Sequence, residues 1–191
     1  FDSLELERYR KYENVWVSLQ SADGDFVEVP KEYPKHDFLR WLLENKNVVL
    51  HGSNNKEIDS LEPRAANCEE KESGNQTAIY GVKDPILPIF YAIKDKDGFK
   101  GMAVSGTTSD GKYEFEIEQA MHDNNQAFSD GAVYVLDAES FTEQRDDHGD
   151  LSGEFVSLEP VKPLGKIMVS KDDFPYFSEM KVYKKGADGK Q

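Results

Sequence analysis

Beyond residue 46 the chain alternates short apolar runs with polar turns, and none of these runs is long. The runs are rich in branched and aromatic residues, which pack well on a pleated surface, so we predict strands. They lie at 47–50, 77–82, 102–106, 112–119, 131–137, 154–159, 165–170 and 179–185. Strands of this number, with helices concentrated near the start, predict an α+β fold built on a mostly antiparallel sheet.

The first 46 residues carry a different pattern. Apolar residues recur there at loosely helical spacing: Leu4, Leu6, Tyr9, Tyr12 and Trp16. This spacing predicts a helix over 3–13. The runs 15–20 and 25–29 alternate and flank an Asp-Gly turn signal, so we expect a hairpin. The segment 35–46 has an apolar face and predicts a short amphipathic helix, and 84–93 predicts a proline-opened helix or turn.

Polar stretches separate the predicted strands. We interpret 62–76 and 142–153 as loops, and 94–100 and 107–111 as turns. No break in composition divides the chain, so 1–191 is interpreted as one domain. Residues 1–46 form its N-terminal extension, 47–185 its core and 186–191 a frayed tail.

Composition excludes several classes of protein. A formal net charge of −14 repels phosphate backbones and argues against bulk nucleic-acid binding. No apolar run approaches the roughly 20 residues of a membrane span, and the first residues lack the apolar region of a signal peptide. The single cysteine, Cys68, excludes an intrachain disulfide and a multi-cysteine metal site. We therefore expect a cytoplasmic protein that neither spans nor binds a membrane.

Familiar catalytic signatures do not occur in the sequence: there is no GxxxxGK[ST], GxGxxG, HExxH or CxxC. Cys68 stands among glutamates, which raise a thiol pKa, so it is a poor nucleophile. The stretch 145–150, "RDDHGD", offers oxygen and imidazole ligands, but a solvated acidic loop is the simpler interpretation, and no metal is predicted. The glutamates of "YEFEIE" form the solvated face of a strand.

The run 47–50 ends in His51, Gly52 and Ser53. Glycine lets a ligand approach the backbone closely, so that its N–H and C=O can bond that ligand. Serine adds a hydroxyl. A histidine at a strand end is more often packed or solvated than functional, so its interest depends on the other stretches.

Two further stretches supply aromatic rings and a carboxylate. Tyr80 ends a predicted strand, and Phe90 and Tyr91 follow it in the predicted helix or turn. Aromatic faces beside a backbone amide form a slot for a flat carboxamide ring, although each ring alone is more simply a core residue. Glu154 opens a strand after Gly153, at a sheet rim, where a carboxylate can stabilise a sugar that gains positive charge.

Together these stretches resemble the ADP-ribosyltransferase superfamily, in the branch of the poly(ADP-ribose) polymerases and diphtheria toxin, which carries a His–Tyr–Glu triad on three strands. "LHGS" is similar to its first motif, "AIYGVKDPILPIFYA" to its second and "GEFVSLEPVKPLGKIMV" to its third. The resemblance implies a split, twisted, mostly antiparallel sheet around an NAD cleft. It also implies transfer of ADP-ribose from NAD, with release of nicotinamide, to an unidentified acceptor that we expect to be a protein.

The resemblance gives individual residues a role. His51 would hold the adenosine ribose of NAD, and the backbone of Gly52 would clamp the nicotinamide carboxamide. Tyr80 would pack on the nicotinamide side, and Tyr91 would stack on the ring. Glu154 would bond the nicotinamide ribose and favour departure of nicotinamide. These residues form the predicted catalytic set of His51, Tyr80 and Glu154, with NAD as substrate.

Other positions extend or weaken the resemblance. Ser53 and Arg64 complete the predicted NAD-binding set; Arg64 would meet the pyrophosphate, and a loop salt bridge is its alternative role. Pro88 stands where polymerase relatives have a serine that reaches the nicotinamide amide. Ser152 stands where arginine-modifying relatives have an acidic residue, so arginine specificity is not supported.

Two other functions compete with transfer. The first is a catalytically inactive module that kept the fold and binds a nucleotide or a protein partner. The second, a 2′-phosphotransferase relative acting on RNA, fits poorly because that chemistry needs basic residues at the cleft and this chain is acidic.

Overall fold

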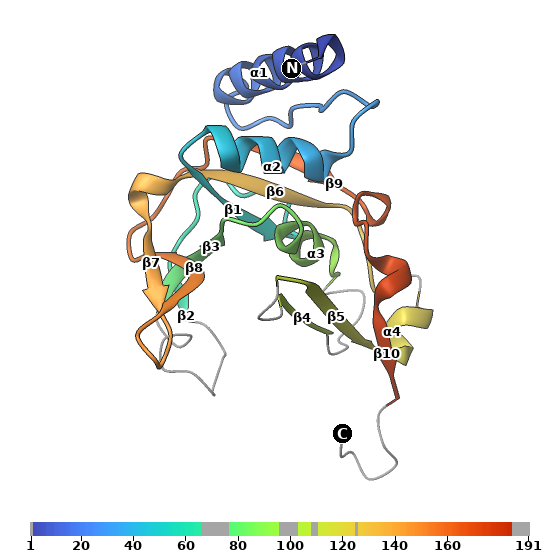
Figure 1. Cartoon of the computed structure of the whole chain (residues 1–191). Coiled ribbons are helices and arrows are strands. Elements are labelled where there is room, and N and C mark those ends of the chain that lie inside the picture. Colours follow the sequence, from blue (N-terminus) through green and yellow to red (C-terminus); the bar gives the residue numbers. More distant parts are fainter. Residues whose placement is uncertain (1, 66–76, 96–102, 108–110, 125, 185–191) are drawn as a thin grey trace.

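The computed structural model describes residues 2–65, 77–95, 103–107, 111–124 and 126–184. These residues form an α+β fold with mostly antiparallel strands in two sheets, as the apolar runs predicted (Figure 1). The helices are α1 (Ser3–Ser21), α2 (Lys35–Asn45), α3 (Leu87–Ile93) and α4 (Gln119–Asp123), with the short 3₁₀ turns η2 (Ala138–Ser140), η3 (Lys171–Asp173) and η4 (Phe177–Glu179).

The larger sheet has seven strands. They are β1 (Val48–Ser53), β2 (Arg64–Ala65), β3 (Thr77–Val82), β6 (Gly131–Asp137), β7 (Thr142–Arg145), β8 (Leu151–Ser157) and β9 (Gly165–Val169). Their order is β7-β8-β3-β1-β6-β9, with β2 beside β3. The smaller sheet has the order β10-β5-β4, from β4 (Ala103–Thr107), β5 (Tyr113–Glu118) and β10 (Lys181–Tyr183). Only β10 and β5 form a parallel pair among the described strands.

The predicted N-terminal hairpin is wrong. Helix α1 continues through 15–20 to Ser21, because Tyr12, Val15 and Leu19 recur at helical spacing and bury one stripe. The Asp-Gly signal ends this helix instead of joining two strands: Asp23 and Gly24 take φ values of 49° and 91° just after the C-cap. Residues 25–29 are extended, and in the described part of the chain their strand contact is one isolated bridge, from Phe26 to Lys166.

The predicted charged loop at 142–153 is also wrong in part. Residues 142–145 form β7, and β8 begins at Leu151, three residues before the predicted strand. The two strands pair as a hairpin at the edge of the larger sheet, where both faces of β7 reach solvent. Charged residues suit such an edge because they oppose pairing with another chain. The same charged residues led to the prediction of a loop where the chain forms a strand.

Other predictions hold in the described residues. The helix at 35–46, the helix option at 84–93 and the hairpin of the strands at 102–106 and 112–119 correspond to α2, α3 and β4–β5. In the predicted loop at 62–76, residues 64–65 form β2. The described residues leave out most of that loop with Cys68, residues 96–100 and 108–110 of the two predicted turns, and the tail at 186–191.

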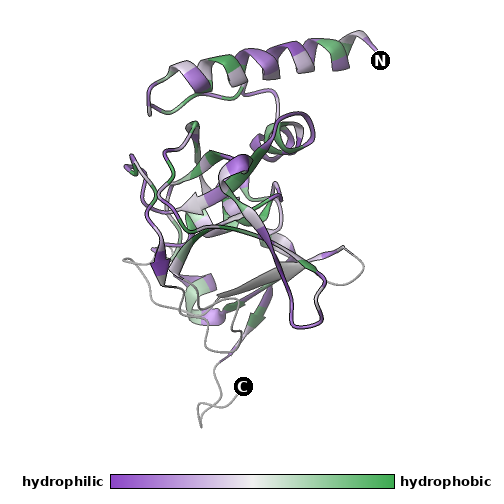
Figure 2. Cartoon of the chain, turned by 90° about the vertical axis from the view of Figure 1, so that its left-hand side faces the viewer, coloured by the Kyte–Doolittle hydropathy of each residue, from purple (hydrophilic) through white to green (hydrophobic). Residues whose placement is uncertain are grey.

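The larger sheet buries a core on each face. On one face, Leu50, Val133 and Ile167 pack with residues of α1, α2, α3 and the smaller sheet. On the other face, Val49, Ile79 and Tyr134 pack beneath the loops that cross the sheet. Helix α1 lies outside α2, away from the smaller sheet (Figure 1), and mixes hydrophilic and hydrophobic residues along its length (Figure 2).

Candidate functional site

The described pairing between β1 and β3 ends where the first motif begins. β1 pairs with β6 along its whole length, from Val48↔Asp137 to Ser53↔Ala132. Its described register with β3 contains a single pair, Leu50↔Val82. The N–H of Ala138 donates to the carbonyl of Asn47, so alternation along β1 turns the N–H and C=O of Gly52 toward β3. The described ladder between β1 and β3 therefore ends close to the residue that was predicted to bond a carboxamide.

The His51 ring lies where this ladder ends. Its Nδ1 is 2.6 Å from the carbonyl oxygen of Tyr80, and both groups come from predicted catalytic residues. A carbonyl can only accept, so Nδ1 carries the hydrogen, and in the neutral ring Nε2 is then the acceptor nitrogen. This hydrogen bond fixes the orientation of the half-buried imidazole and ties the first motif to the second.

The absence of a side chain at Gly52 is required by the packing of the protein, independently of any ligand. A Cβ at this position would lie 1.9 Å from the carbonyl oxygen of Pro88, so the start of α3 packs directly on the β1 backbone. Pro88 is buried, and its carbonyl makes this close backbone contact with Gly52. The Cα side of Gly52 thus meets α3, while its peptide groups face β3.

The predicted catalytic residues His51, Tyr80 and Glu154 lie on three neighbouring strands, β1, β3 and β8. Directly opposed residues of antiparallel strands project from one face. The pairs Tyr80↔Val156 and Val82↔Glu154 therefore place Tyr80 and Glu154 on the same face of the sheet. The pair Arg64↔Ala78 places the exposed Arg64 on that face too. By the same alternation the His51 side chain leaves from the opposite face, and its Nδ1 reaches the backbone carbonyl of Tyr80.

Glu154 is exposed, and its backbone is fixed by the residue two positions before it. Its N–H donates to the Ser152 hydroxyl at 3.2 Å, and that hydroxyl donates to the carbonyl of Gln144 in β7 at 2.8 Å. Gly153 between them has a φ of 80°, which favours glycine. Ser152, considered in the sequence only as a missing acidic residue, thus shapes the bend that carries Glu154.

Helix α3 is positioned by Asp84, a residue that the sequence analysis missed. Its Oδ1 accepts from the N–H groups of Ile86 and Leu87 at 2.8 and 2.9 Å, and its Oδ2 accepts from the Tyr113 hydroxyl at 2.7 Å. Burial, reinforced by this hydrogen bond, raises the pKa of Tyr113, so the phenol stays protonated. An aspartate just before a helix is a capping signal, and that signal was readable in "DPIL".

Tyr91 lies on α3 and is half-buried against the main core. The Lys94 ammonium lies 5.4 Å from its ring centroid, within the range of a cation–π contact. Ser53 is half-buried, and its hydroxyl accepts from the N–H of Asn55 at 3.1 Å.

The acidic stretch 146–150 forms the turn of the β7–β8 hairpin. The Asp146 carboxylate accepts from the N–H groups of His148 and Asp150, both at 2.9 Å, and Gly149 has a φ of 83°. These bonds explain the turn without an ion. In the segments that the structure describes, no group of three or more His, Cys, Asp or Glu side chains is arranged to hold a metal.

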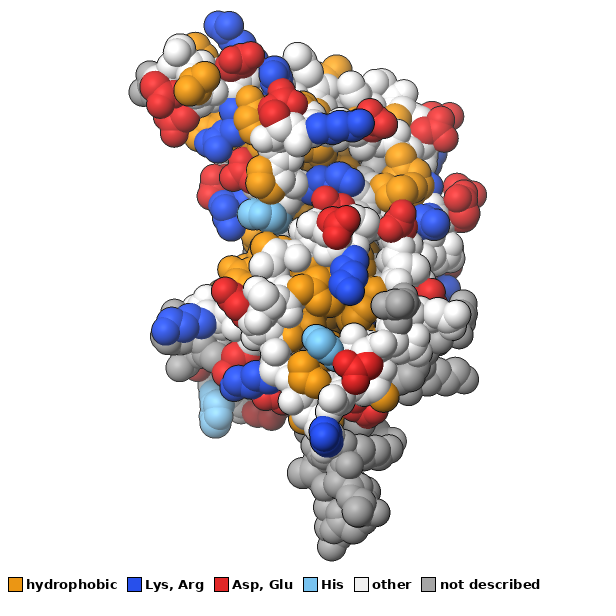
Figure 3. Space-filling model, turned by 90° about the vertical axis from the view of Figure 1, so that its right-hand side faces the viewer, with side chains coloured by type: hydrophobic (Ala, Val, Ile, Leu, Met, Phe, Trp, Pro, Cys, Tyr) orange, Lys and Arg blue, Asp and Glu red, His pale blue; other side chains and the backbone are white. Residues whose placement is uncertain are grey.

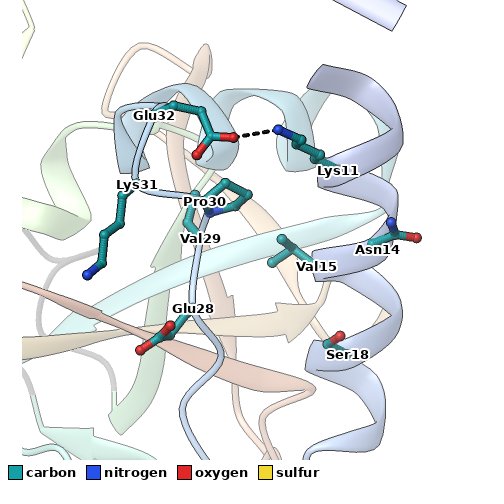
Figure 4. Close-up of a pocket in the computed structure, with 9 residues that line it drawn as sticks. All are labelled: Lys11, Asn14, Val15, Ser18, Glu28, Val29, Pro30, Lys31 and Glu32. Atoms are coloured by element: carbon teal, nitrogen blue, oxygen red, sulfur yellow. Dashed lines mark hydrogen bonds and ion pairs between the residues drawn. The ribbon is translucent and has the colours of Figure 1, made fainter. Parts of the chain in front are cut away.

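Two hollows occur away from the triad. One, of about 420 Å³, lies between α1 and the segment 28–32 and is lined by Val15, Val29 and Pro30 (Figure 4). The 2.5 Å ion pair between Lys11 and Glu32 lies at one end of it. The other, of about 620 Å³, lies along β7 and the end of β8. Neither is lined by His51, Tyr80 or Glu154.

Comparison of the chain with protein-family models, curated proteins and solved structures gave no match. Over the described residues, no helix combines the length and apolar character that a membrane crossing needs.

Proposed function

We propose that this protein transfers ADP-ribose from NAD to an acceptor and releases nicotinamide. The observation that carries the proposal is the placement of the three motifs on the adjacent strands β1, β3 and β8, with the His51 ring bonded to the Tyr80 backbone. The motifs are far apart in the sequence, and the strand order of the sheet brings them side by side.

The residues suit the two ends of NAD. The Nε2 of a neutral His51 is an acceptor for a hydroxyl of the adenosine ribose, because Nδ1 donates to Tyr80. At the other end, the N–H and C=O of Gly52 face β3 and complement the C=O and NH₂ of a carboxamide. Arg64 shares a sheet face with Glu154 and supplies positive charge for a pyrophosphate.

The chemistry needs orientation and charge stabilisation more than a strong nucleophile. The C1–N bond of the nicotinamide ribose breaks, and its electron pair neutralises the cationic ring, which leaves as nicotinamide. The lone pair of the acceptor forms the new bond to C1, and its proton passes to solvent. The Glu154 carboxylate accepts a bond from the ribose hydroxyl and stabilises the positive charge that grows on the sugar.

Replacing Glu154 with Gln tests this function. The exposed side chain keeps its shape and loses its charge, so we expect NAD binding to persist and nicotinamide release to fall roughly a hundredfold or more. Calorimetric titration with NAD and an assay of released nicotinamide on the same samples measure both quantities. Glu159→Gln, at another exposed glutamate beyond the end of β8, is the control and should release nicotinamide like the wild type.

A second function, binding of a nucleotide or a protein partner without turnover, is favoured by Pro88, which supplies no hydroxyl to the carboxamide. If the module binds a nucleotide, NAD should bind and the wild type should release no nicotinamide; if it binds only a protein partner, NAD should not bind. Equal release by wild type and Glu154→Gln would instead contradict the proposed mechanism. A wild type that neither binds nor cleaves NAD would exclude transfer and direct the search to protein partners.

A further inference from the structure

Three polar side chains form a row across the larger sheet. The register pairs His51 of β1 with Tyr134 of β6, and Tyr134 with Lys166 of β9. Directly opposed residues project from one face with Cβ atoms about 5 Å apart. Tyr134 has no exposed surface and Lys166 is 7% exposed. The row therefore runs from the first motif into the protein interior.

The chain that follows the first motif folds back over this row. The Tyr134 hydroxyl donates to the carbonyl of Asn55 at 2.7 Å and accepts from the N–H of Ile58 at 3.1 Å. The Lys166 ammonium donates to the carbonyl of Lys56 at 2.5 Å and lies 4.3 Å from the centroid of the Phe26 ring. Two buried side chains thus bond three backbone groups of the segment 55–58.

The start of the same segment is held from the other side. The Asn54 side-chain amide donates to the carbonyl of Ala92 in α3 at 2.9 Å and to the Ser129 hydroxyl at 3.0 Å. The segment 53–58, which directly follows His51 and Gly52, is therefore tied to β6, β9 and α3.

Burial of this network needs a physical reason. A hydroxyl and an ammonium cost free energy in an apolar interior unless they are bonded, whereas Phe and Met would fill similar space without that demand. A fully bonded polar network fixes one backbone geometry more narrowly than apolar packing does. What the network fixes here is the backbone beside His51.

We propose that Tyr134 and Lys166 are positioning residues for the adenosine half of NAD, which act by holding the segment 53–58 beside His51. The inference rests on the proposed function, in which His51 bonds the adenosine ribose. The nicotinamide end is formed separately, by Gly52, α3 and the face of β3 and β8 that carries Tyr80 and Glu154. Loss of the network should therefore weaken binding of one half of NAD and spare the other.

Tyr134→Phe tests this in the full chain, because it removes the hydroxyl and keeps the ring. Calorimetric titrations with ADP-ribose and with nicotinamide probe the two halves separately. We expect the affinity for ADP-ribose to fall roughly fivefold to tenfold, as two hydrogen bonds are lost, and the affinity for nicotinamide to stay unchanged. Hydrogen exchange at the Ile58 amide should become faster, which shows directly that the segment was held.

Two further variants keep the test independent of general damage to the fold. Tyr12→Phe is the matched control: Tyr12 is also fully buried, and its hydroxyl donates to Asp37 at 2.7 Å between α1 and α2. It should leave both affinities unchanged. Lys166→Met keeps an unbranched side chain and removes the ammonium, and it should lower the ADP-ribose affinity as Tyr134→Phe does.

The possible failures are distinguishable. If the wild type binds both ligands and Tyr134→Phe binds ADP-ribose normally, or loses both affinities equally, the positioning role is overturned while the proposed function stands. If the wild type binds neither ligand, the proposed function fails, and the positioning role falls with it.

Discussion

At the residue scale, Gly52 shows how one small side chain serves the fold and the candidate site together. Its missing Cβ lets the Pro88 carbonyl approach, and the same residue turns its peptide groups toward β3. The sequence indicated a close approach at this glycine and assigned it to a ligand. The structure shows that α3 makes the approach, because a backbone carbonyl fits where a side chain would stand.

Gly52→Ala should therefore destabilise the protein. The new Cβ would lie 1.9 Å from the Pro88 carbonyl oxygen, so β1 or α3 must move, at a cost of about 1–3 kcal/mol. Urea unfolding followed by circular dichroism measures the loss. Gly149→Ala is a useful comparison, because that glycine has a φ of 83° and nothing within 4 Å of a Cβ, so only backbone strain acts there. A Gly52→Ala variant as stable as the wild type would contradict the packing of α3 on β1.

At the element scale, α3 connects the two sheets through Asp84. One carboxylate oxygen bonds the first N–H groups of the helix region, and the other bonds Tyr113 of β5. The sequence predicted a proline-opened helix or turn here, and it is a helix of seven residues. A helix this short is not stable alone, so its position depends on the cap and on burial of Ile89 and Phe90.

Asp84→Ala should loosen α3, since three donors lose their acceptor. We expect the free energy of unfolding to fall by about 1–3 kcal/mol. Nicotinamide release should also fall, because Tyr91 and Pro88 belong to this helix. Tyr113→Phe removes only the bond to β5 and should cost about 1 kcal/mol. Urea unfolding of both variants checks this order, and equal losses would mean that the link to β5, not the bonds to the start of the helix, holds α3.

At the scale of the whole molecule, the α1–α2 layer is fixed to the larger sheet by polar contacts as well as by the core. Asp37 accepts from Tyr12 and pairs with Arg8, while the Lys35 ammonium donates to the carbonyl of Met168 in β9 at 2.8 Å. Lys and Arg side chains lie among Asp and Glu over the face seen in Figure 3, so the net charge of −14 is not one continuous acidic surface there.

His36 in this layer predicts how stability varies with pH. Burial, with help from the Arg40 guanidinium, lowers the pKa of His36 below its ordinary value of 6.5, while Asp37 and Asp173 oppose the shift. The unfolded chain then binds the proton more readily than the folded one. The stability that neutral His36 provides is therefore full above pH 6.5 and is lost as the pH falls through the folded pKa.

Urea midpoints at about pH 7.5 and about pH 5.5 measure this effect. We expect His36→Gln to reduce the drop between the two values relative to the wild type. His148→Gln, in the exposed turn of the β7–β8 hairpin, should leave the drop unchanged. An unaltered drop in His36→Gln would show that other groups dominate the acid response.

The sequence by itself determined the local elements wherever hydrophobic spacing and turn signals agreed. These elements are the strands β1, β3, β6 and β9, the hairpin β4–β5 and the helix α2. The prediction was wrong at 15–29, where the turn signal at Asp23-Gly24 marks a helix end, and in part at 142–153, where a charged stretch forms an edge strand. Both errors have the same cause. Asp and Gly occur in turns and also at helix ends, and charged residues occur in loops and also in edge strands.

Only the tertiary structure decided which residues meet. Strand order places the His51, Tyr80 and Glu154 motifs side by side, and register sets Tyr80 and Glu154 on one face and His51 on the other. The same register aligns His51 with Tyr134 and Lys166, which no local pattern marks. Hydrogen bonds between distant strands fix order and register, and a change of one residue in register would move every side chain of a strand to the opposite face.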